Sequence, residues 1–68
     1  MFDIIAAADA IVDEFPLISR EAQALKLLAA FKQNAGENEF IDTFRAIEII
    51  RDRYQARLRR LTQKHLST

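Results

Sequence analysis

Apolar residues recur along this chain at the spacing of helices. The first stripe has steps of four, three and four residues and consists of Ile4, Ala8, Ile11 and Phe15. This period matches the turn of a helix, whereas a strand would alternate every second residue. Pro16 disfavours helical backbone in the residue before it. The pattern therefore predicts a first helix over about residues 3–14, with Asp3 as its N-cap.

A second stripe follows a residue that is suited to cap a helix. The hydroxyl of Ser19 can accept a hydrogen bond from a free backbone amide, and Glu21 places negative charge in the first turn. The apolar positions after it are Ala24, Leu28, Phe31 and Ala35, flanked by Leu25 and Leu27. Gly36 stands where a left-handed residue commonly ends a helix. We therefore expect a second helix over about residues 19–34.

The longest stripe runs toward the C-terminus without glycine or proline. Its members are Phe40, Phe44, Ile47, Ile50, Tyr54, Leu58 and Leu61. With Asn38 as a candidate N-cap, it predicts a third helix over about residues 38–66. Short connections make neighbouring helices antiparallel. The sequence thus predicts an all-α, up-down-up three-helix bundle with a long C-terminal helix, forming one domain over residues 1–68.

The third predicted helix is longer than its two neighbours. At 1.5 Å rise per residue the three helices would measure about 18 Å, 24 Å and over 40 Å. Apolar residues beyond Tyr54 therefore have no surface of the same chain to cover, and a contiguous apolar stripe in water is typical of an interface. The alternative is a frayed terminus. The spacing favours an interface that includes Leu58 and Leu61.

Charge is unevenly distributed along the chain. Residues 44–68 carry seven basic and two acidic side chains, and residues 1–43 carry three and eight, so +5 and −5 cancel. Four of the basic residues share one side of the third helix, and we call them the basic ridge: Arg53, Arg57, Arg60 and Lys64. The ridge is suited to pair with acidic helices of its own or a neighbouring subunit, to bind an acidic protein, or to contact nucleic-acid phosphates.

The composition argues against several classes of function. The chain has no cysteine and one histidine, so we expect neither a metal site nor a histidine-based nucleophilic triad. A bundle of this size has little room for an enclosed pocket beside its core, and we expect no enzyme and no cofactor. Acidic residues near the N-terminus argue against a signal peptide, and no apolar run reaches the roughly 20 residues of a membrane span. The expected setting is the cytoplasm, without a membrane partner.

Two functions follow from these patterns. The first is a small non-enzymatic protein-interaction module that dimerises through the C-terminal half of the third helix and acts as an adaptor, inhibitor or regulatory accessory protein. Its partner-binding residues would be the anchors Tyr54, Leu58 and Leu61 together with the basic ridge. The alternative is a dimeric nucleic-acid-binding accessory protein in which the ridge contacts phosphates. Among the phenylalanines, we expect Phe2 to face a partner.

Overall fold

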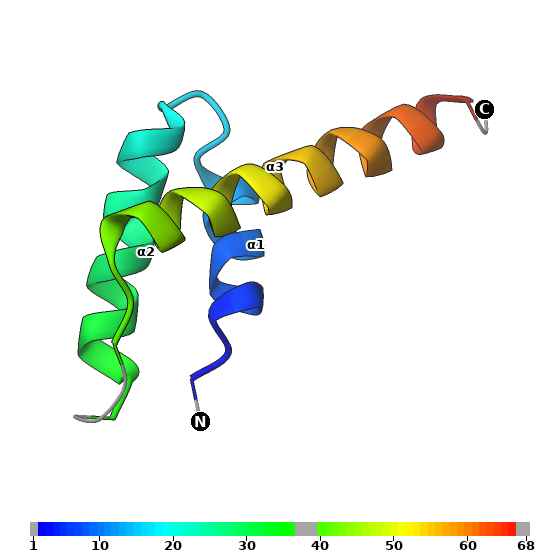
Figure 1. Cartoon of the computed structure of the whole chain (residues 1–68). Helices are drawn as coiled ribbons and strands as arrows, with labels where there is room; N and C mark the ends of the chain where they lie inside the picture. The colour runs from blue at the N-terminus through cyan, green and yellow to red at the C-terminus, as the bar shows by residue number, and fades with distance from the viewer. Residues whose placement is uncertain (1, 37–39, 67–68) are drawn as a thin grey trace.

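The computed structural model describes residues 2–36 and 40–66, with side chains as far as residue 64. This part of the chain forms α1 (Ile4–Glu14), α2 (Arg20–Asn34) and α3 (Thr43–Leu66), and each helix contacts the other two. α1 and α2 form an antiparallel hairpin, and α3 crosses both before projecting beyond them (Figure 1). The predicted all-α three-helix bundle with a long C-terminal helix is confirmed.

The starts of α1 and α2 are set by the predicted caps. The carboxylate of Asp3 accepts a hydrogen bond from the backbone amide of Ala6 at 3.0 Å. The hydroxyl of Ser19 accepts one from the amide of Ala22, also at 3.0 Å. Each bond satisfies an amide that has no carbonyl partner inside its own helix.

α3 begins at Thr43 and not at residue 38. The carboxylate of Asp42 accepts a hydrogen bond from the amide of Arg45 at 2.8 Å, so Asp42 caps this helix. Asn38, the predicted cap, lies outside the described residues. Phe40 continues the apolar spacing of α3 but belongs to the connection before it. Spacing alone does not separate such a residue from the first turn of a helix.

Gly36 does not have the left-handed conformation that the sequence suggested. α2 ends through Ala35, which is extended at φ −85° and ψ 157° and whose amide donates to the carbonyl of Phe31 at 2.8 Å. No described glycine has a positive φ. A Cβ atom added to Gly36 would meet no other atom within 4 Å. The flexibility of glycine is therefore not required at this position.

We expect Gly36→Ala to raise the free energy of unfolding by about 0.4–1 kcal/mol. Alanine restricts the unfolded chain more than glycine does, and the folded chain has space for its methyl group. Thermal unfolding followed by circular dichroism would then show a rise of several degrees in Tm. A fall in Tm would instead show that this turn needs a left-handed residue.

The core lies where the three helices meet. Its buried apolar residues are Ala8, Ile11, Val12, Ala24, Leu27, Ala46, Ile49 and Ile50. Gln23 is also fully buried, and its amide nitrogen donates to the carbonyl of Phe15 at 2.8 Å. This bond joins the start of α2 to the end of α1.

The buried face of α3 is rotated from the predicted stripe. Phe40 and Phe44 are 87% and 76% exposed, whereas Ala46 and Ile49 are buried. Ile50 is the member of the predicted stripe that lies fully in the core. The aromatic side chains at the start of the stripe therefore face solvent.

The projection of α3 makes the molecule longer than a globular domain of its size. The radius of gyration is 12.9 Å and the longest extent is 46 Å. A compact chain of this length would have a radius of gyration of about 11 Å. The accessible surface is 5058 Å², against about 4,400 Å² for a typical folded monomer of this mass. The excess, about 650 Å², reflects the part of α3 that extends past the hairpin.

Candidate protein-interaction surface

Most of the basic ridge contacts α1 of the same chain. Nε of Arg53 donates to Oδ1 of Asp9 at 2.7 Å, and the two side chains are only 25% and 30% exposed. Asp13 pairs with both Arg57, at 3.5 Å, and Arg60, at 3.0 Å. Three members of the ridge thus hold α3 against α1. Within the described part of the chain, Lys64 is the member that makes no ion pair.

The contact with Asp9 also shifts the pKa of Arg53. The hydrogen bond to Asp9 raises the pKa of the Arg53 guanidinium, a smaller desolvation effect opposes the increase, and Asp52 adds to it. Because arginine is already charged at every physiological pH, this increase does not change the charge of the Arg53 guanidinium in that range. A phosphate would have to compete with Asp9 and Asp13 for these guanidinium groups.

Spacing along α1 is the signal that could have identified these acceptors. Asp9 and Asp13 are four residues apart, as are Arg53 and Arg57. Residues at this spacing lie on one side of a helix, so the two pairs match when the helices pack side by side. The sequence indicated internal pairing as one use of the ridge without naming the aspartates.

Tyr54 packs against its own chain as well. It is half-buried beside the core, and the guanidinium carbon of Arg20 lies 3.6 Å from the centre of its ring. Arg20 also donates to the backbone carbonyls of Pro16, at 3.1 Å, and Ile18. These contacts fasten the connection between α1 and α2 to the middle of α3. We call this connection, residues 14–21, the α1–α2 corner.

Beyond the corner, α3 carries exposed apolar side chains. Leu58 is 38% exposed and Leu61 is 47% exposed. They are three residues apart and therefore lie on the same side of the helix. We call residues 56–64 distal α3. This segment has four basic residues and no acidic one. Distal α3 is therefore an amphipathic basic helix whose apolar side is only partly covered by its own chain.

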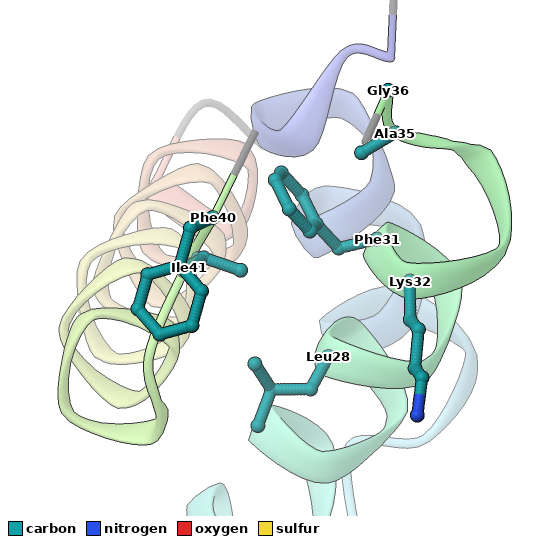
Figure 2. A pocket seen from close by; sticks show the side chains of 7 residues that line it. All are labelled: Leu28, Phe31, Lys32, Ala35, Gly36, Phe40 and Ile41. Carbon is teal, nitrogen blue, oxygen red and sulfur yellow. The ribbon is translucent and has the colours of Figure 1, made fainter. Parts of the chain in front are cut away.

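A second apolar surface lies at the other end of the hairpin (Figure 2). There the end of α2 and the connection to α3 border a pocket of about 420 Å³. The pocket is lined by Leu28, Phe31, Lys32, Ala35, Gly36, Phe40 and Ile41. Leu28 and Phe31 face Ile41 across it, and the amine of Lys32 points away (Figure 2).

Phe2 belongs to this end of the molecule and contacts its own chain. Its ring packs edge to face on Phe31, with ring centres 5.7 Å apart and planes at 82°. Phe2 is half-buried, and the expectation that it faces a partner stays a prediction. The contact extends the apolar packing of α2 toward the N-terminus.

The described part of the chain offers neither a metal-binding cluster nor a membrane-spanning helix. No three His, Cys, Asp or Glu side chains there are grouped so that they could hold a metal ion. None of the helices in that part combines the length and apolar character needed to cross a membrane. A comparison with protein-family models, curated proteins and solved structures finds no match.

Proposed function

We propose that this chain is a protein-interaction module that dimerises through distal α3 and serves in that form as an adaptor, inhibitor or regulatory accessory protein. The observation that carries the proposal is the projection of α3 beyond the hairpin with Leu58 and Leu61 exposed on it. Burying these side chains against a second copy would remove apolar surface from water at about 25 cal/mol per Å².

The pairing of Arg53, Arg57 and Arg60 with α1 favours protein binding over nucleic-acid binding, because a phosphate would have to displace aspartates. The apolar side of distal α3 is only partly covered by its own chain.

Light scattering across a concentration range tests this function. We expect the unmodified chain to be a dimer and both Leu58→Glu and Leu61→Glu to be folded monomers. In a symmetric dimer each substitution occurs twice and buries two charges, so the dissociation constant should rise about a hundredfold or more. Circular dichroism would verify that the variants remain helical.

Phe44→Glu is the matched control. Phe44 is 76% exposed at the start of α3, about 20 Å of helical rise from Leu58, and an exposed apolar side chain is again replaced by glutamate. We expect this variant to dimerise like the unmodified chain. A monomeric unmodified chain, or a dimer that survives both substitutions in distal α3, would contradict the proposed function.

A further inference from the structure

We infer that two copies pair through distal α3 in antiparallel orientation, so that Lys64 of each copy meets the acidic α1–α2 corner of the other. The inference rests on the proposed dimerisation and specifies its geometry. In this arrangement Leu58 of one copy packs on Leu61 of the other, and a two-fold axis passes between them. The acidic groups of the corner are Glu14 and Glu21.

The charge of Lys64 favours antiparallel over parallel pairing. Parallel helices would place Lys64 beside Lys64 of the second copy, and like charges at an interface disfavour that orientation. Arg59 faces an arginine in either orientation and does not distinguish them. Antiparallel helices move Lys64 away from its counterpart. Antiparallel pairing brings each basic C-terminal turn toward the body of the other copy. It also sets the two helix dipoles in opposite directions, which is favourable.

The register places Lys64 beside the corner. If residue 58 stands opposite residue 61 of the other copy, residue 64 stands opposite residue 55, at about 1.5 Å of rise per residue. Residue 55 follows Tyr54, and the guanidinium carbon of Arg20 in the corner lies 3.6 Å from the centre of the Tyr54 ring. Lys64 of one copy therefore arrives at the level of α3 where the corner of the other is attached.

The side of the helix also agrees. Lys64 follows Arg57 by seven residues, close to two turns, so both lie on the same side of α3. Arg57 marks the side on which α1 ends, because it pairs with Asp13 at 3.5 Å. A two-fold axis perpendicular to the paired helices keeps like sides together. Lys64 thus approaches Glu14 and Glu21, neither of which is ion-paired in the described chain.

The corner offers an apolar contact in addition to charge. Leu17 is 98% exposed there, and the carbonyls on either side of it hold Arg20. The two-fold axis lies near Arg60, which forms the described ion pair between α1 and α3 that is farthest along α3. The pairing therefore sets the two hairpins end to end. A helix laid along the corner can therefore cover Leu17 without a collision between the two bodies.

Charge reversal tests the contact. We expect Lys64→Glu to raise the dissociation constant of the dimer about tenfold, and Glu14→Lys with Glu21→Lys to do the same. The combination of all three should restore it to within about threefold of the unmodified chain. Lys32→Glu, at the far end of α2, is the control for the change in net charge and should leave dimerisation unaltered.

Cysteine cross-linking tests the orientation in a chain that has no cysteine of its own. Gln55 and Thr62 are exposed and lie seven residues apart on one side of α3. In the antiparallel dimer residue 55 approaches residue 62 of the other copy, whereas two residues 55 lie about 13 Å apart along the axis. We expect an oxidised mixture of Gln55→Cys and Thr62→Cys to form the mixed disulfide, and neither variant alone to cross-link.

The outcomes distinguish the antiparallel geometry from the proposed dimerisation on which it rests. A mixed disulfide together with restored affinity in the charge-reversed combination supports the antiparallel contact. An unmodified dimer that gives no mixed disulfide and no restoration overturns this geometry and leaves dimerisation standing. A monomeric unmodified chain contradicts the proposed function, and the antiparallel pairing is rejected with it.

Discussion

Leu27→Ala is expected to lower the free energy of unfolding by about 3 kcal/mol. Leu27 has no exposed surface and lies in the core formed by all three helices. The loss combines the transfer of apolar atoms to water with the cavity that remains. A domain of this length has a total stability of only about 3–10 kcal/mol. Urea denaturation at one fixed protein concentration, followed by helical circular dichroism, would measure the loss.

Leu25→Ala is the comparison on the same helix. Leu25 is 63% exposed, so its removal should change the free energy of unfolding by less than about 0.5 kcal/mol. The helix propensity of alanine is favourable in both variants and cannot account for a difference between them. Equal losses for the two substitutions would show that α2 buries a different face.

Local signals were sufficient to predict α1, α2 and the fold class. Asp3 and Ser19 both have side-chain acceptors and precede apolar residues at helical spacing, and the structure uses both as caps. Three amphipathic helices with short connections have few ways to bury their apolar stripes. α2 ends at Asn34, as the sequence indicated, but without the left-handed glycine that was expected to end it, because Gly36 tolerates many conformations and the one it has is available to any residue.

The burial of α3 shows where counting apolar residues fails. Arg53 and Arg57 are only 25% and 22% exposed, since aspartates of α1 pair with their guanidinium groups and their methylene chains can pack against the hairpin. A pattern that scores arginine as polar places these residues on the outer face. The buried face combines them with Ala46, Ile49 and Ile50, whereas Phe44 at the start of the predicted stripe is turned toward solvent.

The sequence predicted where the candidate surface lies along α3 better than it predicted which basic residues on it stay unpaired. Helix length alone indicated that α3 would outrun the hairpin, because rise per residue is nearly constant. Which basic residues remain available depended on tertiary pairing, and the acidic partners come from residues more than 40 positions away, as in the pair of Asp9 and Arg53. Periodicity carries no information about such distant pairs. Lys64 is the ridge member without an ion pair in the described chain, and our proposal assigns it to the contact with a second copy.

The rotation of α3 gives a second large effect. Ala46→Asp is expected to lower the free energy of unfolding by more than about 4 kcal/mol at neutral pH, enough to unfold most of the protein. Ala46 has no exposed surface, and the buried residues described around it are apolar apart from Gln23. Phe44→Asp is the matched control on the same helix. Phe44 is 76% exposed, so its replacement should cost less than about 1 kcal/mol.

The sign of the pH dependence distinguishes a buried charge from a packing defect. Burial would raise the pKa of the introduced carboxyl in the folded state, so the folded protein would bind more protons than the unfolded chain. The destabilisation by Ala46→Asp should therefore shrink as pH falls toward about 4, where the unfolded carboxyl also becomes neutral. Ala46→Asn has the same shape without the charge and should show a constant loss. If Phe44→Asp proved the more destabilising of the two aspartates, the apolar stripe read from the sequence would be the buried face after all.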